Sequence, residues 1–141
     1  MKYLTHSGTI AATRNVPVLW EVLWELNMGL KIVGVMDYVV MQAIKKLDVI
    51  EYGYVSHAKS IKIIKDADML LLLINNVPDN KGIMTGKLYE YLAAHRPIIA
   101  IGPVDGEAAG VLRKTGRGRV IDYEDKKGMT EYLLSLKNWM E

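Results

Sequence analysis

The sequence predicts an α/β fold, a doubly wound, six-stranded parallel sheet with helices on both faces and three layers in all. Short β-rich runs alternate with helical stretches about six times, and parallel strands separated by helices need right-handed crossover connections. The run Met69–Ile74 is apolar at every position, as expected of a central strand covered by helices on both sides. The chain has 141 residues, 50% of them hydrophobic and 24% charged, which suits one domain of this kind.

The first half of the chain is expected to supply three strands and three helices. Pro17 suits the first turn of the first helix, whose apolar residues recur with a period near 3.6. Asp37 is placed to cap the second helix. A loop over residues 55–57 precedes a short third helix marked by Ile61 and Ile64. The three strands are expected at Tyr3–Ile10, Lys31–Val35 and Val49–Tyr54.

The second half is expected to begin with the fourth strand, Met69–Ile74, followed by a polar loop over Asn75–Gly82. A helix over Thr85–His95 comes next. The remaining elements are expected to be a strand at Pro97–Ile101, a helix at Glu107–Thr115, a strand at Arg119–Ile121 and a helix at Glu124–Asn138. We expect the strand order 3-2-1-4-5-6, with Met69–Ile74 in the middle of the sheet.

Composition excludes several classes of function. The chain has no cysteine, so disulfides, thiolate metal sites and a cysteine nucleophile are excluded. Its three histidines are scattered, and its net charge of +2 does not indicate a nucleic-acid-binding protein. The longest apolar run is too short to span a membrane. We expect one cytoplasmic domain over residues 1–141 with no metal and no cofactor, and peripheral membrane association is left open.

Ligands of open α/β sheets bind beyond the carboxyl ends of the strands, so the long polar loop Asn75–Lys87 is the best candidate site. The common nucleotide motifs do not match. Gly8 stands alone after the first strand, where a dinucleotide fold needs G-x-G-x-x-G. A Walker A loop would need glycine at Lys81 and a hydroxyl residue at Leu88. Dinucleotide oxidoreductases and P-loop ATPases are therefore disfavoured.

The start of the fourth helix carries groups that bind anions. Thr85 and Gly86 are expected to open this helix, where free backbone N–H groups favour a phosphate, and Lys87 adds a positive charge. Glu90 lies on the same helix face and can accept hydrogen bonds from a ribose diol. Phosphate donors beside a diol acceptor suit a ribonucleotide. From spacing alone, a solvated ion pair between Lys87 and Glu90 is an equally good interpretation.

The chain resembles the C-terminal half of family-four-like glycosyltransferases of GT-B architecture over essentially its whole length. The matching blocks, in order, are HSGTIAATRNVPVLWEVL, LKIVGVMD, VIEYGYVSHAKSIKIIKDADMLLLL and GIMTGKLYEYLAAHRPIIAIGPVDGEAAGVLRKTGRGRVID. The resemblance implies a Rossmann-like half that binds the nucleotide-sugar donor. A separate N-terminal half binds the acceptor in such enzymes, and we expect that half to be absent here.

The resemblance also implies roles for individual residues. Gly8 and Thr9 match the glycine loop that approaches the donor phosphates, and Arg14 lies near the basic phosphate contact. Tyr54 and Val55 match the turn that holds the base through its main chain.

Glu90 matches the second glutamate of the E-x7-E motif, which binds the ribose hydroxyls in the family. The first glutamate would fall on Gly82, so the contact to the donor sugar must differ. Asp79, Lys81 or main-chain groups are the candidates to replace it. No catalytic residue is assigned, and His6 is interpreted as a structural histidine with its hydrogen bonds satisfied.

The implied function is donor binding in a retaining glycosyltransferase of polysaccharide biosynthesis. A hexose-type sugar would pass from a nucleoside-diphosphate sugar, such as a UDP or GDP sugar, to an unknown acceptor. Two alternatives remain open. One is a domain of a GT-B-like sugar-nucleotide epimerase, for which only His6 is a candidate histidine. The other is a non-catalytic nucleotide-binding module. The isolated domain is expected to bind a nucleoside diphosphate without transferring a sugar.

Overall fold

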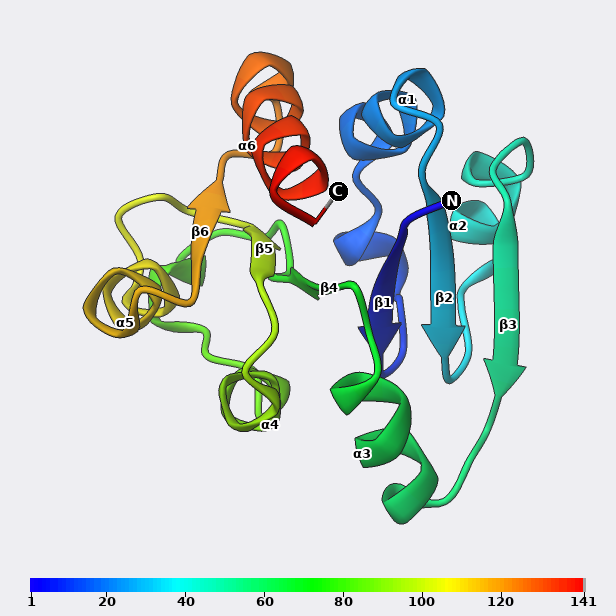
Figure 1. Ribbon diagram of the computed structural model, residues 1–141. Helices are drawn as coiled ribbons and strands as arrows, with labels where there is room; N and C mark the ends of the chain where they lie inside the picture. The colour runs from blue at the N-terminus through cyan, green and yellow to red at the C-terminus, as the bar shows by residue number, and fades with distance from the viewer. Residues whose placement is uncertain (141) are drawn as a thin grey trace.

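Six parallel strands form a single sheet in the computed structural model, which describes residues 1–140 (Figure 1). The strands are β1 (Tyr3–Ser7), β2 (Gly29–Val33), β3 (Val49–Gly53), β4 (Met69–Leu73), β5 (Ile98–Ile101) and β6 (Gly118–Ile121). Their order across the sheet is β3-β2-β1-β4-β5-β6, so the predicted topology is confirmed. All five residues of β4 are buried, as its uniformly apolar sequence predicts.

Helices cover both faces of the sheet (Figure 1). They are α1 (Pro17–Glu25), α2 (Tyr38–Ala43), α3 (His57–Lys65), α4 (Lys87–Ala94), α5 (Glu107–Thr115) and α6 (Lys126–Met140), with 3₁₀ turns η1 (Ala12–Arg14) and η2 (Asn80–Gly82). One buried apolar cluster joins α1, α2 and α6 to one face. A second joins α3, α4 and α5 to the other face. The three-layer αβα architecture is thereby confirmed. Within residues 1–140, no helix has the length and apolar character that a membrane span requires.

Several element boundaries differ from the prediction. The first strand ends at Ser7 instead of Ile10, because Gly8 adopts a φ of +111° and turns the chain out of the sheet. Ile10 keeps only an isolated bridge to Met36. The fourth helix begins at Lys87, two residues later than expected.

Two helix starts also correct the prediction. The Asp37 side chain makes no cap on α2, because its Oδ2 accepts a hydrogen bond from the Ala12 amide at 2.8 Å. His57, expected in a loop, is the first residue of α3. Ser56 caps this helix, since its Oγ accepts from the Lys59 amide at 3.2 Å.

Candidate functional site

Strands β1 and β4 separate before they end. They pair only at Leu4 with Met69 and at Thr5 with Leu70, whereas β1 pairs with β2 along its whole length. This is the point where the strand order changes direction, and doubly wound folds bind ligands at such points. The carboxyl-terminal halves of the two strands therefore leave a gap between them.

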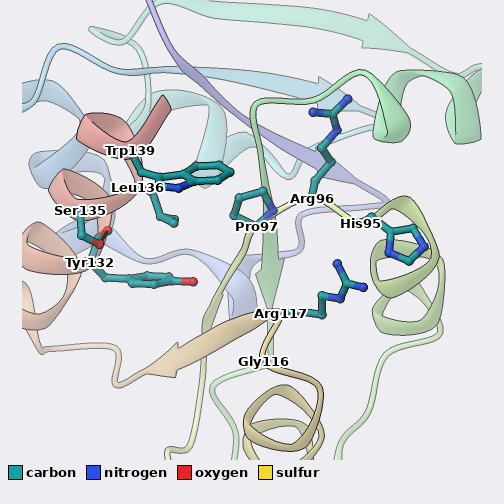
Figure 2. Close-up of a pocket in the computed structure, with 9 residues that line it drawn as sticks. All are labelled: His95, Arg96, Pro97, Gly116, Arg117, Tyr132, Ser135, Leu136 and Trp139. Carbon is teal, nitrogen blue, oxygen red and sulfur yellow. Dashed lines mark hydrogen bonds between the residues drawn. The ribbon is translucent and has the colours of Figure 1, made fainter. Parts of the chain in front are cut away.

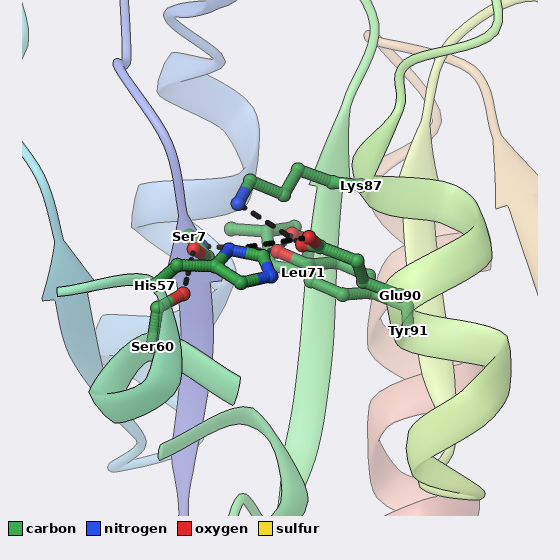
Figure 3. Close-up of polar contacts among 7 residues, drawn as sticks. All are labelled: Ser7, His57, Ser60, Leu71, Lys87, Glu90 and Tyr91. Atoms are coloured by element: carbon green, nitrogen blue, oxygen red, sulfur yellow. Dashed lines mark hydrogen bonds and ion pairs between the residues drawn. The ribbon is translucent and has the colours of Figure 1, made fainter. Parts of the chain in front are cut away.

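The hydroxyl of Tyr91 bridges this gap (Figure 3). It accepts a hydrogen bond from the Ser7 amide at 3.0 Å and donates one to the Leu71 carbonyl oxygen at 2.9 Å. The side chain is fully buried, and burial raises the pKa of its hydroxyl. Ser7 also pairs through its Oγ with Ser60 Oγ of α3 at 3.2 Å. The end of β1 is thus bound to both α3 and α4.

Two adjoining cavities open at the carboxyl ends of the strands, and we call them together the carboxyl-end groove. The first has about 430 Å³ and the second about 460 Å³. They share Ser7, Gly8 and Lys87. The first is lined by His6, Ser7, Gly8, Arg14, Leu72, Leu73, Thr85, Gly86, Lys87, Glu90 and Tyr91. The second is lined by Ser7, Gly8, Thr9, Val33, Gly34, Val35, Tyr54, Val55, Ser56, His57, Ser60 and Lys87.

Every residue predicted to bind the nucleotide lines this groove. Six of them lie in the first cavity, namely Gly8, Arg14, Thr85, Gly86, Lys87 and Glu90. Thr9, Tyr54 and Val55 lie in the second. The structure thus brings together residues that span more than 80 positions of the sequence, and their roles in binding stay predictions.

Two glycines shape the wall between the cavities. Gly8 has a φ of +111° and Gly34 a φ of +117°, both in the region that favours glycine. A Cβ added to Gly34 would lie 3.0 Å from the Gly8 carbonyl oxygen. A Cβ added to Gly8 would lie 3.9 Å from Cε of Lys87. The bare backbone of Gly8 therefore faces the Lys87 side chain.

Arg14 is held at the edge of the first cavity by two neighbours. Its Nη1 donates to the Thr9 carbonyl oxygen at 3.1 Å, and its Nε donates to Asn75 Oδ1 at 3.2 Å. Asn75 is itself fixed, since its Nδ2 donates to Thr13 Oγ1 at 2.8 Å. These contacts orient the guanidinium and leave part of its donor set for an anion.

The Glu90 carboxylate lies between side chains of α3 and α4 (Figure 3). Lys87 Nζ lies 3.0 Å from Glu90 Oε2, and His57 Nδ1 lies 3.9 Å from Glu90 Oε1. The Lys87 contact is an ion pair by distance but lacks the geometry of a hydrogen bond, so Oε2 is buried with no hydrogen-bond partner. The ion pair that sequence spacing allowed is present, and it lies in the groove.

Buried polar atoms without partners concentrate in the first cavity. Within residues 1–140, four buried side-chain oxygens or nitrogens have no hydrogen-bond partner. Three belong to residues that line this cavity, namely His6 Nδ1, Thr85 Oγ1 and Glu90 Oε2. Because proteins seldom leave such atoms unpaired, the concentration indicates a place where a polar ligand binds.

The surroundings of His6 differ in one respect from those expected from the sequence. His6 is buried as expected of a structural histidine, but its Nδ1 has no partner, so its hydrogen bonds are not satisfied. Burial, followed by the positive charges of Arg14 and Lys87, lowers its pKa from 6.5 to about 3. The ring is therefore neutral at physiological pH.

The loop expected to replace the missing first glutamate does not reach the groove. Gly82 ends η2, and neither Asp79 nor Lys81 lines either cavity. Lys81 Nζ lies 2.6 Å from Asp105 Oδ2, and this contact lowers the pKa of the Asp105 carboxyl. Which groups replace the first glutamate stays a prediction.

A third cavity, of about 470 Å³, lies at the opposite end of the sheet beside the amino ends of β5 and β6 (Figure 2). Arg96, Arg117 and Trp139 line it. None of the unpaired polar atoms belongs to its lining, and it lies away from the strand ends where α/β folds bind ligands. Within residues 1–140, no three His, Asp or Glu side chains gather as a metal site. The carboxyl-end groove is therefore the candidate site.

Comparison with known proteins gives matches among solved structures alone. No protein-family model matches the chain, and no curated protein does. WaaG, a glycosyltransferase involved in lipopolysaccharide biosynthesis, superposes with a TM-score of 0.72 at 18% identity, over 98% of this chain and 38% of WaaG. TarM gives 0.69 at 17% identity, over 97% of this chain and 28% of TarM.

Anabaena HepE, solved in complex with UDP and glucose, gives a TM-score of 0.65 at 14% identity, over 99% of this chain and 38% of HepE. This chain therefore spans well under half the length of these proteins. Its fold is that of one half of a GT-B glycosyltransferase, as the resemblance in the sequence implies.

Proposed function

We propose that this chain is the donor-binding domain of a glycosyltransferase and that the carboxyl-end groove binds a nucleoside-diphosphate sugar. The observation that carries the proposal is the first cavity, whose lining combines the cations Arg14 and Lys87 with buried polar atoms that have no hydrogen-bond partner. A polar, anionic ligand would satisfy both features. HepE, which has the same fold, was solved with UDP and glucose, and this supports the choice of ligand.

The diphosphate is assigned to the first cavity. Arg14 and Lys87 supply two positive charges, and the first turn of α4 supplies free N–H groups next to Thr85 and Gly86. The Gly8 backbone can approach closely because no Cβ blocks it. These groups stabilise the negative charge of a leaving diphosphate.

The nucleoside is assigned to the region between Glu90 and the end of β3. The Glu90 carboxylate accepts the ribose hydroxyls, because it faces the cavity from the first turn of α4. The base extends into the second cavity toward Tyr54 and Val55. Tyr54 is 94% exposed, so its ring is available to cover a bound base.

The reaction we propose is retaining transfer of a hexose-type sugar, with an N-terminal acceptor domain closing over the groove. Transfer needs an acceptor held against the anomeric carbon in a water-poor site, which the groove alone does not provide. A sugar-nucleotide epimerase would need several carboxylates in the cleft. Among the described residues, Glu90 is the one carboxylate that lines the groove, so this alternative is not favoured.

Isothermal calorimetry with UDP, GDP and ADP tests the proposal. We expect at least one of them to bind with a dissociation constant on the order of 0.1–1 mM, since half of the usual enclosure is absent. Glu90→Ala should weaken binding, whereas Glu131→Ala on the exposed surface of α6 should not. Absence of binding by all three nucleotides at millimolar concentration would contradict the proposal.

A further inference from the structure

Lys87 separates the two halves of the groove. Its side chain lines both cavities, which otherwise have only Ser7 and Gly8 in common. Its Cε lies against the bare backbone of Gly8, so the side chain extends from the start of α4 toward the end of β1. The Lys87 side chain therefore lies where the two cavities adjoin.

The same side chain covers the carboxylate assigned to the ribose. Lys87 Nζ lies 3.0 Å from Glu90 Oε2, an oxygen with almost no exposure to solvent (Figure 3). The other oxygen faces His57 Nδ1 at 3.9 Å. A ribose hydroxyl can reach Oε2 only after the ammonium has moved. Glu90 therefore cannot bind a ribose diol with both oxygens in the arrangement that the structure shows.

We propose that Lys87 is a phosphate-dependent latch over Glu90, and this inference rests on the proposed function. Without a phosphate, Nζ pairs with Glu90 and masks the ribose site. When a nucleoside diphosphate binds, Nζ transfers to a phosphate oxygen and uncovers Oε2 for the ribose hydroxyls. The groove thereby selects ribose that carries a phosphate and rejects free nucleosides.

The exchange is energetically reasonable because the two pairings differ in strength. The side chains of Lys87 and Glu90 are 32% and 25% exposed, and an ion pair with that access to water is weak. A contact between an ammonium and a diphosphate is charge-assisted on both sides and involves a higher negative charge. Arg14 cannot act as the latch, because Thr9 and Asn75 hold its guanidinium in place.

The latch makes a prediction that a simple phosphate contact does not make. If Lys87 only bound phosphate, removing its charge would weaken the binding of nucleoside diphosphates and leave the binding of nucleosides unchanged. If it also masks Glu90, its removal should improve nucleoside binding. We expect Lys87→Met to bind the corresponding free nucleoside about 3–10 times more tightly than the unmutated chain does, since the ion pair between Lys87 and Glu90 no longer competes. The same variant should bind the diphosphate about 10 times less tightly.

Ligand-observed NMR with the nucleoside, and calorimetry with its diphosphate, test this. Lys59→Met is the matched control, because Lys59 is exposed on α3 and lines neither cavity. Lys87→Gln provides a second variant with the charge removed. In the double variant Lys87→Met/Glu90→Ala the increase in nucleoside affinity should disappear, since this increase depends on the uncovered Glu90 carboxylate.

An unchanged or lower nucleoside affinity in both Lys87 variants would overturn the latch. If the unmutated chain then still bound the nucleoside diphosphate, and Glu90→Ala weakened that binding, the donor site would be supported without the latch. If the parent bound no nucleoside diphosphate, both the donor site and the latch would be wrong.

Discussion

The Tyr91 hydroxyl accepts a hydrogen bond at 3.0 Å from the amide of Ser7, 84 residues earlier in the chain. In a continuous parallel ladder, a main-chain carbonyl of the neighbouring strand would accept from this amide. Where β1 and β4 separate, the Tyr91 hydroxyl replaces that carbonyl as the acceptor, and it donates its own hydrogen to the Leu71 carbonyl oxygen. One side chain of α4 thus satisfies both strands and keeps the first cavity open.

Tyr91→Phe should destabilise the fold by about 1–3 kcal/mol, because it leaves the buried Ser7 amide and Leu71 carbonyl without this partner. Urea denaturation followed by circular dichroism measures the free energy of unfolding. Tyr89→Phe is the control, since Tyr89 is 60% exposed on the same helix. Equal stability of the two variants would contradict the role given to the Tyr91 hydroxyl.

His6 should make the stability depend on pH. Its pKa is about 3 in the folded chain and 6.5 when exposed, so the unfolded chain binds more protons between these values. The folded state has its full stability with respect to His6 above pH 6.5. It loses stability as the pH falls toward 3, because the unfolded chain takes up a proton that the buried ring does not. Between pH 7 and pH 5 this amounts to about 2 kcal/mol.

Urea titrations of the parent and His6→Gln at pH 7, 6 and 5 measure this effect. His6→Gln should lose less stability over this range, because glutamine does not titrate. His95→Gln, at an exposed position, should lose as much as the parent. A parent and a His6→Gln variant with the same pH dependence would show that His6 is not buried as a neutral ring.

Gly34→Ala should destabilise the chain more than Gly53→Ala. Gly34 has a φ of +117°, and an added Cβ would lie 3.0 Å from the Gly8 carbonyl oxygen. We expect a loss of about 1–3 kcal/mol from backbone strain and a further loss from this contact. Gly53 has a φ of +66° with open space around it, where alanine costs about 1 kcal/mol. Thermal unfolding compares the two, and an equal loss would contradict the close approach of Gly8 and Gly34.

Most of the fold could be predicted from the sequence because its signals are local. The uniformly apolar Met69–Ile74 indicated a central strand, and helical periodicity predicted a helix with Pro17 in its first turn, as α1 has. The alternation of strands and helices, together with this doubly apolar fourth strand, then predicted the strand order of a doubly wound sheet. The first strand was predicted too long because β propensity does not show that Gly8 turns the chain.

The residues of the site were predictable from local spacing or from the family resemblance, which also pointed to Gly8, Arg14 and Tyr54. Lys87 and Glu90 stood out by their spacing at a helix start. Tyr91 did not, because its hydrogen-bond partners lie 20 and 84 residues away. Asp37 lies at the position of an N-cap of α2. Its carboxylate instead accepts a hydrogen bond from the amide of Ala12, 25 residues earlier in the chain. Contacts between distant segments leave no signal in local spacing.

We propose that the carboxyl-end groove, and not the cavity at the opposite end of the sheet, binds a nucleoside diphosphate. Titration of the ¹⁵N-labelled domain with UDP, GDP or ADP, followed through amide chemical shifts, tests this most directly. We expect saturable shifts of the amides of Gly8, Thr9, Gly86, Lys87 and Glu90 and no shift of the amides of Gly116, Arg117 and Ser135. Shifts confined to Gly116, Arg117 and Ser135, or no shifts at millimolar nucleotide, would contradict it.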